Sequence, residues 1–264
     1  MEILTKPGRI VEGVYLLDVY AWKGRGTTSP IILKADKPAL LDTGMRSSAQ
    51  DLIRGLMDIG IEGRGKFYIL VSHRHSDHAG SAAPLLKTFP RGTLGLHEAS
   101  LKHLLDPRRL NEGSKALLGE YGEPLDPLPE GRDIITLKDG DIVDLGSGFE
   151  VEVVYTPGHT SDHLSFYEKK TRLMYCGDVA GVFYPPLARI TPTTFYPSFK
   201  PHLYLQSLEK MMGYDIQVLA FAHYGAVLQG AEEILTKSIE TTKEWIDMSR
   251  KVLREGGDSE ELLK

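Results

Sequence analysis

Four side chains that can bind a metal ion fall within six residues, directly after a short apolar run. Residues 67–71 are typical of a buried strand, and residues 72–78 that follow read SHRHSDH. On an extended segment His73 and His75 point the same way, because side chains alternate with a period of two. As the chain turns into a helix, Asp77 and His78 come round to a neighbouring position. These four side chains can therefore face one pocket at the end of the strand, the alternative being a surface turn that is rich in histidine.

Three further polar segments follow apolar runs that are typical of strands. His159 lies in a Pro-Gly turn, Asp178 follows a glycine, and His223 follows residues 217–222. Taken singly, each segment could be an ordinary strand end and turn. Imidazole nitrogens and carboxylate oxygens are ligands that zinc accepts, and four of them in six residues suit two adjacent ions better than one.

Composition excludes several other classes of protein. The chain has 264 residues, 41% of them hydrophobic and 25% charged, with a formal net charge of −5. This balance disfavours a protein whose main task is to neutralise a phosphate backbone. A single cysteine excludes a disulfide framework and a cysteine-rich zinc module. With neither a signal-peptide pattern nor an apolar run long enough for a membrane span, we expect a cytoplasmic chain.

One asparagine, Asn111, and four glutamines stand beside 15 prolines. Such depletion of residues prone to deamidation predicts a thermophilic source, although the charged fraction is not raised as it often is in hyperthermophiles.

The order of the periodic segments predicts an α/β (α+β) fold in a single domain, residues 1–264. Short apolar runs alternate with longer amphipathic runs, which is typical of sheets covered by helices. Strands followed by helices occur up to about residue 100 and again after about residue 133, so we expect two similar halves, about 1–130 and 131–264. Residues 104–132 are rich in proline, glycine and charge, and are expected to form an insertion or lid.

The order of the polar motifs resembles that of the metallo-β-lactamase superfamily. An HxHxDH segment at 73–78, PGHT at 157–160, Gly177-Asp178 and the late His223 occur in sequence, and an earlier LLDTG segment at 40–44 also matches. The resemblance covers residues 40–225. It implies a four-layer αββα sandwich, in which two mixed sheets are flanked by helices.

The resemblance also implies a set of metal ligands. One metal would be held by His73, His75 and His159, and the other by Asp77, His78 and His223. Asp178 would bridge two Zn²⁺ ions, with Fe or Mn as alternatives. Asp77 and Asp178 are the catalytic candidates. Asp77 could also donate or accept a proton during the reaction. Asp42 and His163 are expected to lie behind the ligands and to orient them, although Asp42 could instead cap a turn.

Several aromatic side chains are candidates for the wall of a substrate pocket, with simple packing as the alternative for each. They are Trp22, Phe183, Tyr184, Phe195, Tyr196 and Tyr224. Three histidines outside the motifs, His97, His103 and His202, are expected to be ordinary surface or partly buried residues.

The ligand set predicts a dinuclear metal-dependent hydrolase. A hydroxide bridging the metals would cleave an ester-like bond in a phosphodiester, a lactone or a thioester. Two alternatives stay open: a mononuclear iron oxidoreductase similar to persulfide dioxygenases, and an RNA-processing nuclease. We expect a small-molecule substrate and no membrane partner; the net charge disfavours nucleic acid, and a homo-oligomer is left open.

Overall fold

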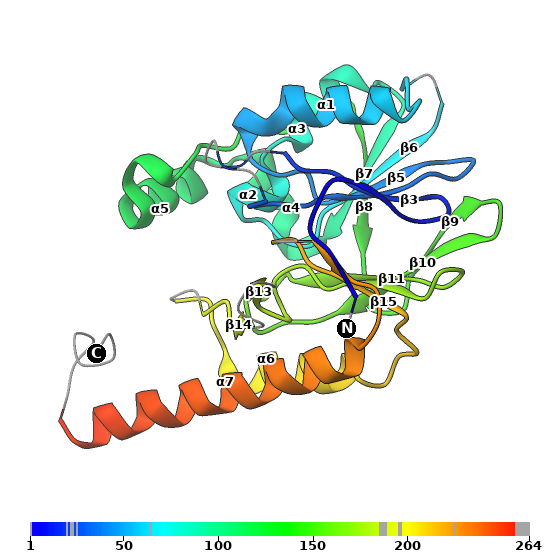
Figure 1. The fold of residues 1–264 in the computed structure, drawn as a ribbon. Coiled ribbons are helices and arrows are strands. Elements are labelled where there is room, and N and C mark those ends of the chain that lie inside the picture. The colour runs from blue at the N-terminus through cyan, green and yellow to red at the C-terminus, as the bar shows by residue number, and fades with distance from the viewer. Residues whose placement is uncertain are drawn as a thin grey trace.

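Two seven-stranded sheets form the centre of the protein in the computed structural model (Figure 1). The structure describes residues 2–19, 21, 24, 26–63, 65–184, 189–194, 197–223 and 225–256. The first sheet has its strands in chain order: β2 (Gly8–Val11), β3 (Val14–Leu16), β4 (Ile31–Leu33), β5 (Ala39–Leu41), β6 (Phe67–Leu70), β7 (Gly92–His97) and β8 (Asp133–Leu137). β2 to β5 are antiparallel neighbours and β5 to β8 are parallel, so this sheet is mixed.

The second sheet is also mixed, because β12 and β15 are parallel while its other neighbours are antiparallel. Its strands lie in the order β1 (Ile3–Leu4), β16 (Ala226–Val227), β15 (Val218–Ala220), β12 (Leu173–Tyr175), β11 (Leu164–Glu168), β10 (Phe149–Tyr155) and β9 (Ile142–Gly146). A separate hairpin pairs β13 (Val182–Tyr184) with β14 (Arg189–Thr191).

Helices cover the outer face of each sheet (Figure 1). The first sheet carries α1 (Ala49–Asp58), α2 (Ser76–Ala79), α3 (Ala82–Thr88), α4 (Glu98–Leu105) and α5 (Arg108–Leu118), with short 3₁₀ turns η2 (Arg46–Ser48) and η3 (Gly119–Tyr121). The second sheet carries α6 (Pro201–Met211), which begins with proline, and α7 (Ala231–Arg254). None of the described helices is both long and apolar enough to cross a membrane.

Three apolar clusters account for the layers. One lies between the sheets and contains, for example, Leu41 of the first sheet and Phe166 of the second. Another packs α1 and α3 on the first sheet, and the third packs α6 and α7 on the second. Burying both faces of both sheets stabilises the fold, because apolar area is removed from water on every layer. The predicted four-layer αββα sandwich is thus confirmed.

The two halves of the chain do not divide at residue 130. β8 follows that point but pairs with β7 in the first sheet, while β1 pairs with β16 in the second. The predicted insertion at 104–132 contains α5 and η3 followed by extended chain, and α5 projects from the body of the protein (Figure 1).

The strand directions bring the polar motifs to one edge of the sandwich. β5 and β6 are parallel, so Asp42 and the histidine segment follow neighbouring strand ends. β11 is antiparallel to both β10 and β12, so these two strands run the same way, and β15 runs parallel to β12. The loops that carry His159, Asp178 and His223 therefore leave the second sheet at one edge.

Candidate metal centre

The first group of converging ligand atoms comes from both sheets. His73 Nε2 lies 2.9 Å from His75 Nδ1, and His159 Nε2 lies 3.0 Å from the same His75 atom. The Asp178 Oδ2 atom lies 3.2 Å from His159 Nε2. One ligand atom from each of these four residues lies within 4.8 Å of the others. This first ligand group can therefore direct three imidazole nitrogens and a carboxylate at one cation.

The second ligand group consists of Asp77, His78 and His223, whose ligand atoms also lie within 4.8 Å of one another. The Asp77 Oδ2 atom is 3.6 Å from His78 Nε2 and 3.4 Å from His223 Nε2. Asp77 and His78 sit on α2, while His223 follows β15 of the other sheet. A second cation here would thus be held by both halves of the sandwich.

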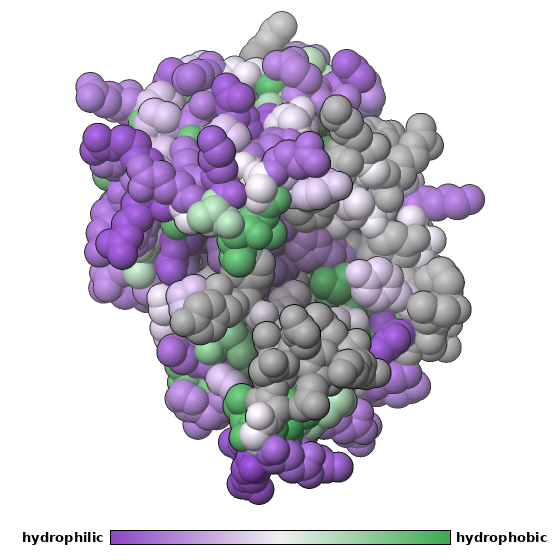
Figure 2. All heavy atoms as spheres, turned by 90° about the vertical axis from the view of Figure 1, so that its left-hand side faces the viewer, coloured by the Kyte–Doolittle hydropathy of each residue, from purple (hydrophilic) through white to green (hydrophobic). Residues whose placement is uncertain are grey.

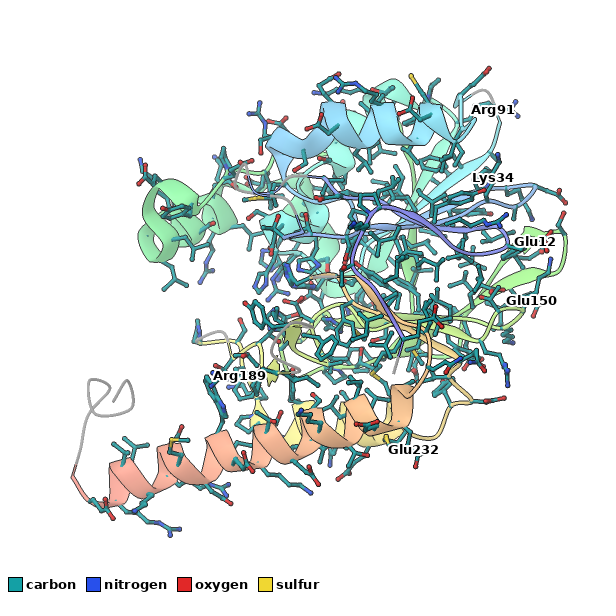
Figure 3. The ribbon with its side chains drawn as sticks, in the orientation of Figure 1. Glu12, Lys34, Arg91, Glu150, Arg189 and Glu232 are labelled. Carbon is teal, nitrogen blue, oxygen red and sulfur yellow. The ribbon has the colours of Figure 1, made fainter. Side chains whose placement is uncertain are left out.

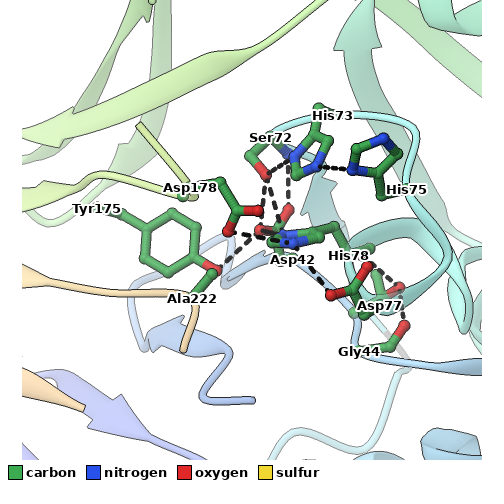
Figure 4. Close-up of polar contacts among 12 residues, drawn as sticks. Asp42, Gly44, Ser72, His73, His75, Asp77, His78, Tyr175, Asp178 and Ala222 are labelled. Atoms are coloured by element: carbon green, nitrogen blue, oxygen red, sulfur yellow. Dashed lines mark hydrogen bonds and ion pairs between the residues drawn. The ribbon is translucent and has the colours of Figure 1, made fainter. Parts of the chain in front are cut away.

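Asp178 faces both groups with different oxygens. Its Oδ2 atom lies near His159 of the first group, whereas Oδ1 lies 3.4 Å from both His78 Nε2 and His223 Nε2 of the second. A carboxylate placed in this way can bridge two cations. Figure 4 shows Asp178 beside His73 and His78, with Asp42 next to them.

The outer ring nitrogens of three histidines donate to oxygen atoms, which leaves each Nε2 directed at the site. His78 Nδ1 is 2.7 Å from the Asp42 carboxylate, His159 Nδ1 is 2.8 Å from the carbonyl oxygen of Thr193, and His223 Nδ1 is 2.8 Å from that of Thr27. Because carbonyl and carboxylate oxygens accept, each Nδ1 carries the hydrogen. In the neutral ring, this tautomer leaves the Nε2 lone pair available for a metal.

Two buried atoms in the site have no hydrogen-bond partner among the described residues. They are His78 Nε2 and Asp178 Oδ1, which lie 3.4 Å apart. A buried polar atom without a partner is costly, so such atoms are normally satisfied by protein, water or an ion. The residues present therefore fit metal ions in both their chemistry and their orientation, and the cluster is able to bind them.

Burial and neighbouring charges move the pKa values of the ligands in opposite directions. Burial and nearby His159 lower the pKa of His75 to about 3. Burial also disfavours protonation of His223, but Asp178 and Asp77 overcome it and raise its pKa to about 10. For both carboxylates burial favours the neutral form, yet the histidines keep their pKa values below the usual range. The site thus holds ionised carboxylates, whose charge a metal cation can neutralise.

Asp42 lies directly behind His78, as the sequence predicts for an orienting residue. Its carboxylate accepts from the backbone N–H of Ser72 at 2.6 Å, from the Ser72 hydroxyl at 2.7 Å and from the Tyr175 hydroxyl at 2.8 Å, besides His78 (Figure 4). The backbone of Asp42 has a φ of 59°, a region that aspartate tolerates better than most residues. This carboxylate links the end of β5, the histidine loop and β12.

His163 holds the backbone of Asp178. Its Nε2 accepts from the Asp178 N–H at 3.0 Å, and its Nδ1 lies 2.9 Å from the Thr156 hydroxyl. Burial, with nearby His159, lowers the pKa of His163 to about 3, which keeps the ring neutral and able to accept. His163 is therefore placed to position the bridging candidate rather than to belong to either ligand group.

A buried ion pair joins the two histidine-bearing loops. Asp162 accepts from the Arg74 backbone N–H at 3.0 Å, from its guanidinium at 2.5 Å and from the Ser100 hydroxyl at 2.5 Å. Arg74 stands between His73 and His75, and Asp162 lies three residues after His159. This contact fixes the two loops of the first ligand group to each other and to α4.

The ligand atoms open into a cavity of about 1000 Å³. His75, Asp77, His159, Asp178 and His223 form its floor. Its other walls come from α4 and α5 on one side, and from β13 and the segment around Thr193 and Pro197 on the other. Figure 2 shows the hollow from the side of α5, with hydrophobic residues on its rim.

The structure agrees with the aromatic pocket candidates only in part. Tyr184 lines the cavity and is 46% exposed. Phe183 does not line it: this side chain is fully buried in the cluster under α7, where its ring stacks on Phe221, because alternate residues of β13 face opposite ways. Four candidates lie outside the described residues, namely Trp22, Phe195, Tyr196 and Tyr224.

Sequence reasoning missed several residues around the site. Lys102, His103 and Arg109 line the cavity, and His103 is partly buried there. His97 instead accepts from the Ala99 N–H and caps the start of α4. The polar residues Lys102 and His103 on α4 could have indicated the cavity wall. No sequence signal marks the carbonyl groups of Thr27 and Thr193, which accept from His223 and His159.

Comparison with known sequences identifies the family. Residues 23–223 match the metallo-beta-lactamase superfamily profile. Since this match covers most of the chain, the protein belongs to the metallo-β-lactamase superfamily, and the predicted membership is confirmed.

This chain covers less than two thirds of the length of each of three curated relatives. The metallo-beta-lactamase fold-containing protein ST1585 of Sulfurisphaera tokodaii is 29% identical over 167 residues, 61% of each chain. A hydroxyacylglutathione hydrolase of Hahella chejuensis is 31% identical over 133 residues, 50% of this chain and 35% of that protein. Diflavin flavoprotein A 1 of a Synechocystis strain is 30% identical over 164 residues, 60% of this chain and 24% of the relative.

Solved structures share the fold at low sequence identity. The ST1585 structure from Sulfolobus tokodaii has a TM-score of 0.71 at 23% identity and covers 89% of this chain and 86% of that one. The Rm3 metallo-beta-lactamase has a TM-score of 0.67 at 18% identity, with 92% and 94% covered. Such likeness supports the architecture alone.

Proposed function

We propose that this protein is a dinuclear metal-dependent hydrolase that cleaves an ester-like bond in a small molecule. The observation that carries the proposal is the placement of Asp178, whose two oxygens face two separate ligand groups. Seven ligating side chains with one shared carboxylate suit two cations, of which zinc is the first candidate and iron or manganese the alternatives. The name of the Hahella chejuensis relative, a hydroxyacylglutathione hydrolase, supports hydrolysis and includes thioesters among the candidate bonds.

The chain's own residues would bind the substrate and move protons. Two divalent cations, when bound, supply a water of lowered pKa and polarise the oxygen on which charge develops. Asp77 has 18% of its side chain exposed, against 6% for Asp178, and lines the cavity. The Asp77 Oδ2 atom is therefore the ligand-group carboxylate oxygen best placed to exchange a proton with a reacting group. The cavity walls would hold the substrate and exclude water.

Metal quantification combined with a substrate panel tests the proposal. Purified protein loaded with zinc should hold two ions per chain and should hydrolyse at least one member of a phosphodiester, lactone and thioester panel. Asp178→Ala should lose metal and lower turnover at least a hundredfold, whereas Asp144→Ala, an exposed carboxylate on β9, should do neither.

Other outcomes would support a different function. One iron per chain, with oxygen consumption on a persulfide, would identify a persulfide dioxygenase-like oxidoreductase and overturn the hydrolase proposal. Cleavage of RNA alone, with steeply salt-dependent binding, would identify a nuclease.

A further inference from the structure

The helix α5 turns apolar side chains toward the cavity, although Leu110 at its start also packs against the core under the first sheet. Leu110, Leu117 and Leu118 line the cavity, together with Ser114, and this spacing puts them on one side of a helix. No residue of α5 is buried, and Leu117 is 56% exposed. An exposed apolar strip that forms the wall of a cavity marks a ligand-binding surface.

Polar contacts to the following segment hold α5 in place. The Asn111 side chain donates to the carbonyl oxygen of Leu125 at 3.0 Å and accepts from its N–H at 2.8 Å. Farther along, the N–H of Leu128 donates to the carbonyl oxygen of Leu104 at 3.0 Å. The helix is thus fixed while its leucines stay available to a ligand. Figure 3 shows side chains of α5 projecting toward β13 and β14, at the opposite end of the sheets from the labelled Glu12 and Glu150.

We use the term apolar wall for six cavity residues from α5, from the chain after it, and from the opposite side around β13. They are Leu110, Leu117, Leu118, Leu125, Val182 and Pro197. Together they can cover an alkyl or acyl chain from two sides.

A basic wall, which we define as Arg74, Lys102 and Arg109, lines the same cavity beside His103. Arg74 is paired with Asp162, but Lys102 and Arg109 form no ion pair with the described residues. Glu123, an acidic residue of this cavity, accepts hydrogen bonds from the backbone and hydroxyl of Ser47. Burial lowers the pKa of His103, and the nearby charges of Arg74, Lys102 and Arg109 lower it further. The potential on this wall is therefore positive, which favours an anionic group.

We infer that the substrate is an amphiphilic anion. Its scissile bond would lie at the ligand groups, its alkyl or acyl chain would pack on the apolar wall, and an anionic group would pair with Lys102 and Arg109. The position of the scissile bond rests on the proposed function, whereas the preference for an apolar chain and for an anion rests on the cavity alone. Lys102 and Arg109, which form no ion pair with the described residues, lie in the same cavity as the leucine strip. This arrangement suits a small amphiphile better than a nucleic-acid backbone, which needs an extended basic track.

Calorimetric binding of non-reactive probes tests the two preferences without catalysis. The zinc-loaded protein should bind 1-octanesulfonate at least tenfold more tightly than 1-butanesulfonate, which has the same anion on a shorter chain. It should also bind 1-octanesulfonate at least tenfold more tightly than 1-octanol, which lacks the anion. Equal dissociation constants across either pair would overturn the inference, as would tighter binding of a ten-nucleotide RNA than of 1-octanesulfonate.

Variants assign each preference to its wall. Leu117→Asn should weaken 1-octanesulfonate binding about tenfold and leave 1-butanesulfonate unchanged. The double variant Lys102→Met, Arg109→Met should weaken both sulfonates and leave 1-octanol unchanged. Ala116→Asn and Lys115→Met are matched controls, because both positions are exposed on α5 and neither lines the cavity. If the controls weaken binding as much as the wall variants, the walls are not the binding surface.

Hydrolysis of matched esters separates this inference from the proposed function. The 4-nitrophenyl monoester of octanedioate should show a KM at least tenfold below that of 4-nitrophenyl octanoate. The lysine–arginine double variant should raise that KM about tenfold with kcat within twofold. Turnover of both esters with equal KM would overturn the inference and leave the hydrolase proposal standing. Failure to hydrolyse any member of the wider panel would overturn the hydrolase proposal, while the sulfonate titrations would still decide the binding preferences.

Discussion

Arg74 and Asp162 form an ion pair that joins the two loops of the first ligand group. The Asp162 side chain is fully buried and that of Arg74 is 17% exposed, with 2.5 Å between the guanidinium nitrogen and the carboxylate oxygen. Burial alone would raise the pKa of Asp162. The charge of Arg74 and the hydrogen bonds donated to the Asp162 carboxylate lower that pKa instead. The pair therefore keeps a charged carboxylate behind the histidines, at a place where neither residue can be a ligand.

Removing one partner should destabilise the fold and the metal site together. Asp162→Ala leaves Arg74 without its buried counter-charge, a change that costs about 3–5 kcal/mol. We expect a lower free energy of unfolding in urea and a loss of zinc from the first ligand group, measured by metal analysis. Asp215→Ala breaks an exposed pair with Arg172 and should cost less than about 1 kcal/mol. Equal effects of the two substitutions would show that the buried pair has no special role.

The two catalytic candidates should differ in the number of metals they control. Asp77 belongs to the second ligand group only, so Asp77→Asn should leave one zinc ion per chain. Asp178 faces both groups, so Asp178→Asn should weaken both sites and leave less than one ion per chain after dialysis. Metal content at equal free zinc concentration checks both expectations. Retention of two ions by Asp178→Asn would contradict the bridging assignment.

The candidate ligands carry local signals in the sequence. His73 and His75 alternate on one extended segment after β6, and the remaining ligands each follow a strand end. Taken singly, the later motifs could be ordinary strand ends, so their convergence was anticipated from the resemblance of the motif order to that of the metallo-β-lactamase superfamily.

What sequence reasoning missed depends on contacts between distant segments. The carbonyl groups of Thr27 and Thr193, which orient His223 and His159, are backbone atoms that no side-chain pattern marks. The strip of leucines on α5 has the periodicity of a core-facing helix, yet it faces the cavity. Phe183 shows the converse, since an aromatic residue in a loop-rich segment proves to be a core residue.

Acid should destabilise the chelator-treated protein through His163. This ring is neutral in the folded protein, with a pKa of about 3, whereas an unfolded histidine titrates near 6.5. Between pH 3 and pH 6.5 the unfolded chain binds one more proton than the folded protein. The contribution of this group to the free energy of unfolding is therefore complete above about pH 6.5 and is lost as the pH is lowered toward 3. Each pH unit costs about 1.4 kcal/mol for this one group.

Two substitutions separate the charge of His163 from its hydrogen bond to Asp178. His163→Gln lacks the titrating ring but can still accept from the Asp178 N–H, so its stability should fall by about 2 kcal/mol less than that of the unsubstituted protein between pH 6.5 and 5. His163→Leu also lacks the titrating ring and leaves the N–H without an acceptor, so it should bind zinc more weakly than His163→Gln at pH 7.5. Urea unfolding at each pH and zinc titration are the measurements. Equal acid sensitivity in all three proteins would exclude His163 as the titrating group.

Adding one methyl group at each of two glycines should have opposite effects on stability. A Cβ at Gly80, which follows α2 and its ligands, would lie 2.2 Å from the Ser76 carbonyl oxygen and 2.5 Å from the Arg46 backbone nitrogen. Neither backbone atom can move without displacing α2 or η2, so Gly80→Ala should cost about 3 kcal/mol and weaken zinc binding. A Cβ at Gly113 in α5 meets nothing within 4 Å, and Gly113→Ala should stabilise the helix by about 1 kcal/mol. Urea midpoints of the two variants test the contrast, and a Gly80→Ala midpoint equal to that of the unsubstituted protein would show that η2 can move aside.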